Sequence, residues 1–163
     1  MILINTVRYN IFGVDYAALI PKHKSDVEAA RKAASVGYPT IEPILGELLI
    51  WMKDMNWPVA SEIELVLRDV GVPLSQHVLA VLQGGDDVWK YWVLQRIALN
   101  FDEEARKWIL DECVRIVNSP TKGEIAEEVH LVAHDIIILD SFDSAESMLS
   151  EQGVPPKSDR AGG

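Results

Sequence analysis

Cysteine is almost absent from this chain, and long hydrophobic runs are absent altogether. Cys113 is the only cysteine among 163 residues, which excludes an internal disulfide and a cysteine-rich zinc site and favours a reducing compartment. The densest apolar stretch, residues 136–139, is far too short to span a bilayer, and residues 1–5 lack the basic start and cleavage site of a signal peptide. We therefore expect a soluble, cytoplasmic protein of one domain.

Basic residues are in the minority. The chain has 25 acidic and 15 basic residues, a formal net charge of −10, which repels phosphate backbones and anionic lipids. We expect neither nucleic acid nor a membrane as a partner, and no cofactor. The charge would speed encounter with a basic protein, although many acidic proteins use such a charge for solubility alone. Both interpretations stay open at this point.

Turn-forming tetrapeptides recur at a nearly constant interval. Val-Gly-Tyr-Pro at 36–39 returns as Val-Gly-Val-Pro at 70–73, an offset of 34, and Asp-Met-Asn-Trp at 54–57 has a partner in Asp-Asp-Val-Trp at 86–89, an offset of 32. Glycine suits the left-handed position after a helix, and proline fits the first turn of the next helix. Helical patterning with a period in the thirties predicts an all-α fold, a right-handed α-solenoid of about three to four HEAT-like helix pairs.

The spacing of apolar residues predicts where the helices lie. Ile41, Ile44, Leu45, Leu48 and Met52 are three or four residues apart and share one helix face. Acidic residues or serine at 25–26 and 86–87 are placed to cap helices. The predicted pairs are 25–35 with 40–53, 58–69 with 74–82, and 88–99 with 103–117, followed by a helix at 122–140 and preceded by a short one at 15–20.

The two ends of the chain depart from this pattern. We expect an N-terminal arm at 1–14, with weak strand-like alternation at 2–7, a helical repeat domain at 15–140, and a C-terminal extension at 141–163. Residues 141–149 can continue as an amphipathic helix, whereas 152–163, with paired prolines and glycines, has the composition of a disordered tail.

Four sequence words carry a resemblance to a known family. They are Leu-Ile-Pro-Lys-His-Lys-Ser-Asp at 19–26, Asp-Met-Asn-Trp-Pro at 54–58, Asp-Asp-Val-Trp-Lys-Tyr-Trp at 86–92 and Asn-Ser-Pro-Thr-Lys-Gly-Glu at 118–124. Over residues 19–139 the chain resembles a family of small, functionally uncharacterised bacterial domains with HEAT-like repeats. The resemblance implies a helical repeat fold and carries no activity across.

All four words are expected to lie at, or run into, the start of the first helix of a pair, so stacking of the pairs would line them along one edge. Tryptophan flanked by charge is typical of binding hot spots. Alternatively, the aspartates cap helices while the tryptophans fill gaps between repeats. The residues predicted to bind a partner are Asp54, Asn56, Trp57, Asp86, Asp87, Trp89 and Lys90, with Lys22, His23, Asp26 and Glu124 on the same edge.

Three aromatic rings crowd one short segment. Trp89, Tyr91 and Trp92 cannot all point into one narrow core stripe of a helix, so at least one faces outward or lines a groove. The spacing favours Val88 and Trp92 as core members, with Leu94 or Val93 beside them.

Residues that carry chemistry are sparse. His130 and His134 lie one turn apart, but Leu131 stands where the zinc-protease motif needs glutamate, and Glu127 would be a third ligand only by hypothesis. Cys113 follows two acidic residues that raise its pKa, which favours a core role. The chain also lacks a glycine-rich phosphate loop and a Gly-X-Ser-X-Gly motif. We expect no bound metal and no catalytic residue.

Together these patterns predict a non-catalytic protein-binding module, a monomer or weak homo-oligomer, whose partner is a basic protein. Small size, negative charge and the lack of catalytic groups motivate a sharper hypothesis, an immunity protein that neutralises a co-encoded bacterial toxin. One alternative is an enzyme on a HEAT-like scaffold acting on a nucleic-acid base, as in alkylpurine DNA glycosylases; its residue types are present, but the basic groove that DNA requires is not. Another is a self-assembling structural protein with an exposed apolar patch.

Overall fold

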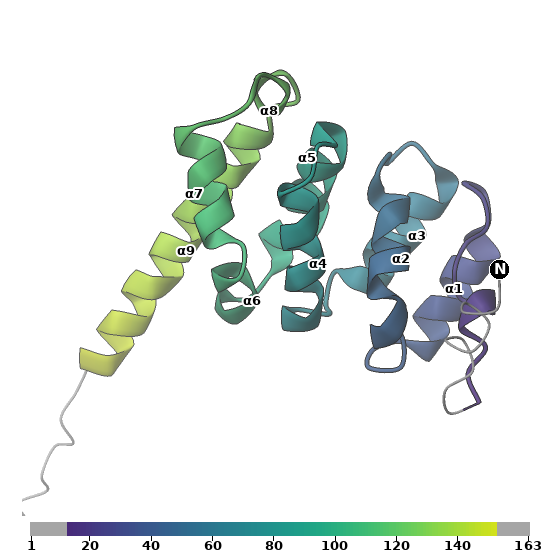
Figure 1. Ribbon diagram of the computed structural model, residues 1–163. Helices are drawn as coiled ribbons and strands as arrows, with labels where there is room; N and C mark the ends of the chain where they lie inside the picture. Colours follow the sequence, from purple (N-terminus) through teal and green to yellow (C-terminus); the bar gives the residue numbers. More distant parts are fainter. Residues whose placement is uncertain (1–12, 153–163) are drawn as a thin grey trace, which may run out of the picture.

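The computed structural model describes residues 13–152, and every regular element among them is helical (Figure 1). The arm, strand and tail predictions at 1–12 and 153–163 lie outside these residues. The elements are the 3-10 helix η2 (Tyr16–Ala18), α1 (Val27–Val36), η3 (Glu42–Ile44), α2 (Leu45–Leu49), η4 (Ile50–Met52), α3 (Pro58–Leu67), α4 (Val72–Leu82), α5 (Asp87–Arg96), η5 (Ala98–Asn100), α6 (Glu103–Lys107), α7 (Leu110–Asn118), α8 (Lys122–Ala126) and α9 (Val129–Gln152).

Helix boundaries follow the caps and glycines that the sequence offers. The carboxylate of Asp26 accepts a hydrogen bond from the amide of Ala29, which caps α1, and the carboxylate of Asp86 caps α5 in the same way. Gly37 and Gly71 follow α1 and α3 with φ angles of 69° and 72°, a left-handed conformation that favours glycine. The all-α prediction and these turns are therefore confirmed.

Three predicted helices are interrupted. Residues 40–53 form α2 between two 3-10 helices, around Pro43 and Gly46. The stretch 103–117 breaks after α6, where the amides of Trp108 and Ile109 bond to carbonyls three residues back. The stretch 122–140 breaks at Glu128, whose φ is 57°, but α9 then runs to Gln152. The predicted boundary at residue 140 thus falls inside a helix, and the prediction that 141–149 is helical is confirmed.

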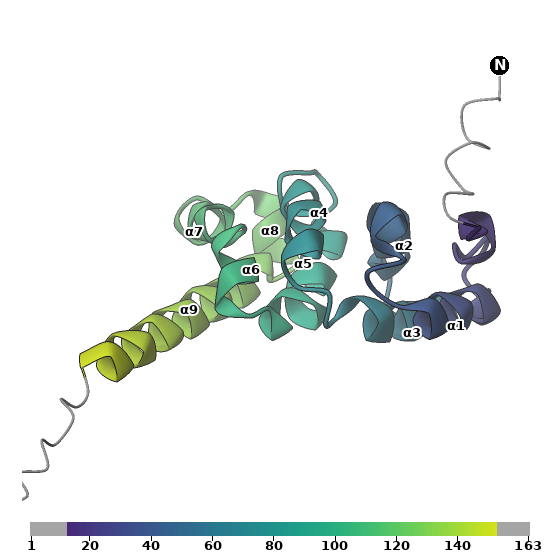
Figure 2. The ribbon, with the colours of Figure 1, turned by 90° about the horizontal axis from the view of Figure 1, so that it is seen from below.

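The helices pack mainly on near neighbours in the sequence. Contacts join α1 to α3, α2 to α4, and α4 to both α5 and α6, so the helices follow one another along the molecule from α1 to α7 (Figures 1 and 2). The long helix α9 closes the row by packing on α5, α6 and α7. The buried apolar side chains form one core cluster that reaches from Tyr16 to Ile136 and includes the whole predicted stripe of residues 41–52.

The second half of α9 extends past this core (Figure 1). Its last anchor is Arg106 of α6, which is buried and donates to the carbonyl of Phe101 at 2.8 Å and to the carboxylate of Asp143. No helix of the described residues 13–152 is both long and apolar enough to cross a membrane.

Candidate partner-binding surface

Three contacts in or directly beside the four sequence words join successive parts of the chain. At the first junction, the amide of Val59 in α3 donates to the carbonyl of Lys24, before α1, at 3.1 Å. At the second, Nζ of Lys53 after η4 lies 3.7 Å from a carboxylate oxygen of Asp86 and 4.6 Å from the ring centroid of Trp89. The residues that flank the word at 54–58 thus contact the words at 19–26 and 86–92.

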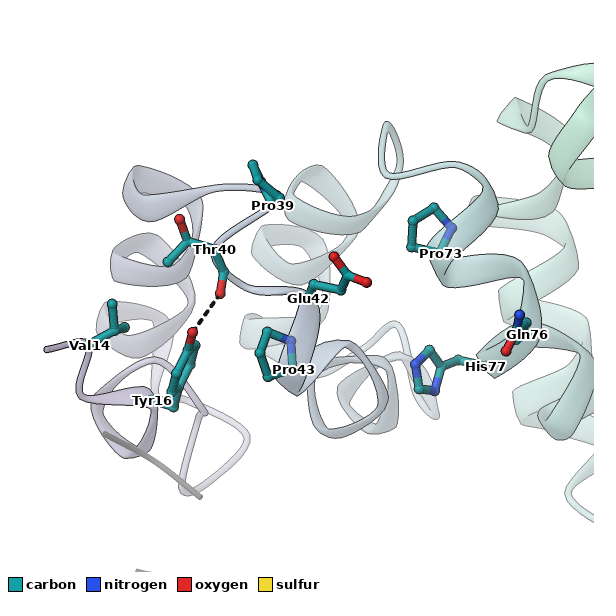
Figure 3. A pocket seen from close by; sticks show the side chains of 9 residues that line it. All are labelled: Val14, Tyr16, Pro39, Thr40, Glu42, Pro43, Pro73, Gln76 and His77. Atoms are coloured by element: carbon teal, nitrogen blue, oxygen red, sulfur yellow. Dashed lines mark hydrogen bonds between the residues drawn. The ribbon is translucent and has the colours of Figure 1, made fainter. Parts of the chain in front are cut away.

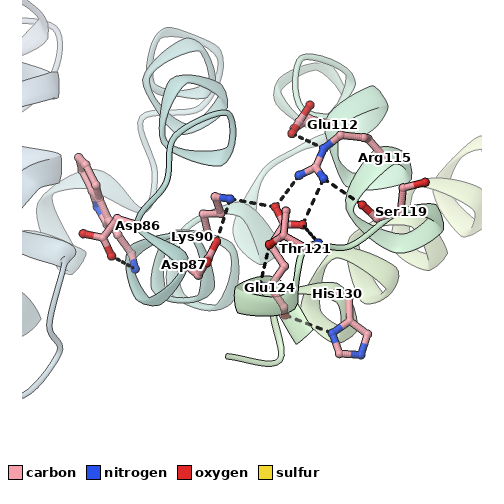
Figure 4. Close-up of polar contacts among 10 residues, drawn as sticks. Asp86, Asp87, Lys90, Glu112, Arg115, Ser119, Thr121, Glu124 and His130 are labelled. Carbon is pink, nitrogen blue, oxygen red and sulfur yellow. Dashed lines mark hydrogen bonds and ion pairs between the residues drawn. The ribbon is translucent and has the colours of Figure 1, made fainter. Parts of the chain in front are cut away.

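The third junction is a buried ion network between α5, α7 and α8 (Figure 4). The carboxylate of Glu124 is fully buried, lies 2.8 Å from Nζ of Lys90, and accepts hydrogen bonds from Arg115 and from the amide of Thr121. Nζ of Lys90 also lies 2.9 Å from Oδ1 of Asp87. Lys90 and Arg115 thus share Glu124, and Arg115 also pairs with Glu112 at 2.7 Å. The word at 118–124 is therefore joined to the word at 86–92.

Pairing decides the charge state of this network. Burial alone would raise the pKa of Glu124, but hydrogen bonds from Arg115, Lys90 and the amide of Thr121 outweigh it and hold the pKa at about 2. Burial likewise lowers the pKa of Lys90, and its bonds to Glu124 and Asp87 more than offset this, so the pKa lies above its ordinary value. Both groups are therefore ionised near neutral pH.

Stability is expected to fall in acid because of Glu124. Its folded-state pKa of about 2 lies below the ordinary 4.5, so its stabilisation is complete above pH 4.5 and is lost as the pH falls towards 2. The shift corresponds to about 3 kcal/mol. Urea unfolding across this range measures the effect, and the variant Glu124→Gln should lose less stability on acidification. Parallel curves for the two proteins would assign the acid sensitivity to other carboxylates.

Most predicted partner-binding residues at α5 have internal roles. Asp86 caps the helix, and Asp87 and Lys90 belong to the ion network, in which Lys90 is only 4% exposed. Trp89 is half-buried, and its indole Nε1 donates to the carbonyl of Leu49 at 3.1 Å. These are the capping and gap-filling roles of the alternative interpretation. Partner binding by these residues stays a prediction.

The word at 54–58 is more accessible. Asn56 is exposed. Its backbone amide and its side-chain Nδ2 donate to Oδ1 of Asp54 at 2.8 and 2.9 Å, so Asp54 closes a turn. The N-cap position of α3 belongs to Trp57, not Asp54. Trp57 is half-buried and meets Trp51 edge to face at 5.9 Å between centroids. Asn56 and part of Trp57 are thus within reach of a partner.

The remaining predicted edge residues lie just before α1. Lys22 and His23 are exposed, and the backbone amide of Lys22 donates to the second carboxylate oxygen of Asp26 at 3.0 Å. The carboxylate of Asp26 therefore holds the loop before α1 in place and also caps α1. Glu124, the last of the predicted edge residues, is buried and cannot be reached by a partner.

A hollow of about 230 Å³ lies where α5 meets the turn between α8 and α9. Tyr91 and Trp92 meet edge to face there, with ring centroids 5.0 Å apart. Glu127 and Glu128 are exposed, and neither forms an ion pair within residues 13–152. We call this the aromatic hollow; its lining residues are Val88, Tyr91, Trp92, Ala126, Glu127 and Glu128.

The aromatic hollow confirms one sequence prediction and corrects another. At least one of the three crowded rings lines a groove, as expected. Val88 and Trp92 are not core residues, because Val88 is 40% exposed and Trp92 is half-buried. The inner face of α5 is instead made by Val93, Leu94 and Lys90, since the ion network draws the lysine inward.

The acidic side of the hollow could not be found from the helical pattern. The sequence predicts an unbroken helix through 127–128, whereas Glu128 adopts a left-handed backbone conformation, which costs a non-glycine residue about 1 kcal/mol. The turn reverses the chain and brings both glutamates beside the rings. Non-glycine residues in this conformation are often found at functional sites.

A larger pocket of about 730 Å³ lies near the other end of the molecule (Figure 3). Three prolines form part of its wall, and the hydroxyl of Tyr16 is already engaged with the carbonyl of Thr40 at 3.0 Å. Glu42 and His77 are its ionisable groups. The sequence did not predict this pocket, because its residues come from three separate segments.

The residues weighed for chemistry are Cys113, His130 and His134. Cys113 is fully buried, and burial, with a smaller contribution from Glu112, raises the pKa of its thiol to about 12, as expected for a core residue. His130 directs Nδ1 at the carbonyl of Glu124, 3.3 Å away, while His134 is exposed. Within residues 13–152, no three His, Cys, Asp or Glu side chains are grouped as metal ligands would be.

Comparison with known proteins confirms one part of the resemblance, namely that the chain matches an uncharacterised domain family. A family model described as "Domain of unknown function (DUF5071)" matches residues 19–137, a segment that includes all four words, the ion network and the aromatic hollow. No curated protein matches the chain. Because the family model spans well over half of the sequence, the chain belongs to this DUF5071 family of uncharacterised domains.

Proposed function

We propose that this protein is a non-catalytic binding module for a basic protein, built as a right-handed α-solenoid of HEAT-like helix pairs. The packing of α1 on α3 and of α2 on α4, one pair further along each time, supports the solenoid. The observation that carries the binding role is the aromatic hollow, in which two rings stand beside two carboxylates that form no ion pair with any residue of 13–152.

The hollow suits a cationic side chain. The guanidinium of Arg96 lies 5.8 Å from the ring centroid of Trp92, so this ring already accepts a cation at its face. Glu127 and Glu128 supply negative charge that no described side chain neutralises. An arginine or lysine of a partner would gain both interactions, and the net charge of −10 would steer a basic protein to the surface.

More specifically, we propose that the protein is an immunity protein that neutralises a bacterial toxin encoded beside it. Small size and acidity support this form. Co-expression with the product of a neighbouring gene tests it, since the chain should restore growth in cells that the toxin alone arrests. Continued arrest would exclude this form while leaving binding of another basic protein open.

The binding role is tested by capture and by variants of the hollow. The tagged full chain should retain a basic protein from a lysate of its source cells through a salt wash. Trp92→Ala should then weaken binding of the purified partner by about 2 kcal/mol, as expected for a hot-spot tryptophan. Glu127→Gln with Glu128→Gln should weaken binding and reduce its salt dependence.

Matched controls lie elsewhere on the surface. Trp108, 46% exposed at the junction of α6 and α7, is the control for the ring, and Glu104→Gln with Asp111→Asn is the control for charge. Both controls should bind as the parent chain does. Equal binding by all variants would remove the hollow from the proposal, and failure to retain any basic protein would refute the binding role.

A further inference from the structure

Helix α9 is apolar on two opposite faces. Its inner face buries Val129, Val132, Ala133 and Ile136 in the core. Leu131, Ile138, Phe142 and Leu149 are exposed, between 39% and 71%, and at 100° per residue all four project from the side of the helix opposite the core. From Leu131 to Leu149 this outer stripe runs roughly 27 Å.

The outer stripe has the spacing of a helix–helix seam. Residues 131, 135, 138, 142, 145 and 149 follow one another at alternating steps of four and three, which is the a/d pattern of a heptad repeat. Five of the six are apolar, the exception being Asp135. The second half of α9 projects beyond α6 and α7 (Figure 2). The exposure of Leu131, Ile138, Phe142 and Leu149 shows that no other described helix covers these side chains.

The charge of α9 decides between the possible occupants. The helix contains five acidic residues and no lysine or arginine. Asp140 and Asp143 face Arg106, but Asp135, Glu146 and Glu151 have no cationic partner among residues 13–152. A second copy of α9 would bring like charges together, whereas a helix flanked by lysine and arginine would neutralise them.

From this geometry we propose that the outer stripe of α9 docks an amphipathic, basic helix of a partner protein, with Phe142 and Leu149 as its apolar anchors. This inference rests on the proposed function in that it gives the basic partner a helical docking element. It adds a second contact surface, separate from the aromatic hollow, and assigns a role to the projecting end of α9.

A synthetic helix is the probe. It carries leucine at its a and d positions and lysine or arginine at e and g, and it should bind the full chain in a fluorescence anisotropy titration. Phe142→Ser with Leu149→Ser should weaken this binding by at least about tenfold. Because both side chains are at least 70% exposed, the melting temperature should barely change. Leu65→Ser, at an exposed leucine of α3, should bind as the parent does.

Two further peptides and one measurement complete the test. One control peptide has the same composition as the probe, but its leucines are moved out of the a and d positions. The other keeps leucine at a and d and has glutamate at e and g. Both should bind weakly. Equal binding of the scrambled peptide would show charge attraction alone and overturn the inference. Analytical ultracentrifugation provides the second control. A dimer of the full chain that dissociates in the Phe142→Ser, Leu149→Ser variant would also overturn the inference, because the stripe would then bind a second copy of the chain.

The captured partner separates this inference from the proposed function. Weakening by Trp92→Ala together with full binding by the Phe142→Ser, Leu149→Ser variant would uphold the hollow and refute the docking helix. The reverse pattern would uphold the docking helix and remove the hollow.

Discussion

Replacing Glu124 with alanine is expected to lower the free energy of unfolding by about 3–5 kcal/mol, the range for breaking a buried ion pair from one side. The reason is Lys90, which is 4% exposed and would keep a buried charge without its closest partner. Arg115 is less affected, since its side chain is 37% exposed and water can reach it. The substitution also removes the acceptor for the amide of Thr121 in the capping box of α8.

Urea unfolding of the parent and the variant measures this loss. Glu28→Ala is the comparison, because Glu28 pairs with Lys32 on the exposed face of α1 and such pairs contribute less than about 1 kcal/mol. Adding Lys90→Met to Glu124→Ala should recover much of the stability, because Lys90 would otherwise remain a buried charge paired with Asp87 alone. If Glu124→Ala costs no more than Glu28→Ala, the network does not stabilise the junction of α5 and α8.

Replacing Gly123 with alanine is expected to destabilise the fold by about 1–3 kcal/mol, the usual cost of added atoms that force packed neighbours to shift. A Cβ at Gly123 would lie 1.9 Å from Oδ2 and 3.0 Å from Cγ of Asp87, so Asp87 would have to move away from Lys90. Alanine is otherwise the better helix former by about 1 kcal/mol. The expected sign is thus the opposite of that for an exposed helical glycine.

Thermal melts of Gly123→Ala and of the control Gly85→Ala decide the matter. A Cβ at Gly85 meets no atom within 4 Å, so this control should melt within a few degrees of the parent. An unchanged or raised melting temperature for Gly123→Ala would mean that Asp87 can move away from Gly123 with little loss of stability.

Local features of the fold were predictable because each depends on residues close in sequence. Asp26 and Asp86 satisfy amides three residues away. Gly37 has a positive φ directly after α1, and Gly71 has one directly before α4. The apolar stripe at 41–52 is buried as its spacing predicts. The helical extension at 141–149 likewise follows from local composition.

Features that depend on distant partners were not predictable. By residue type, Lys90 belongs at the surface, and its burial depends on Glu124, 34 residues further along the chain. Glutamate at a left-handed position gives no local signal, so the break at Glu128, and with it the acidic side of the aromatic hollow, is invisible in the pattern. The crowded rings at 89–92 did signal a groove, but not what would lie opposite them.

The burial of Cys113 makes the chain ready for site-specific labelling without a cysteine-free background. A fully buried thiol whose pKa is raised to about 12 reacts very slowly with maleimides near neutral pH. One cysteine introduced at Ser150, which is exposed on the projecting end of α9, would therefore carry a fluorophore or spin label alone. Its signal would report directly on whatever approaches that end of the molecule.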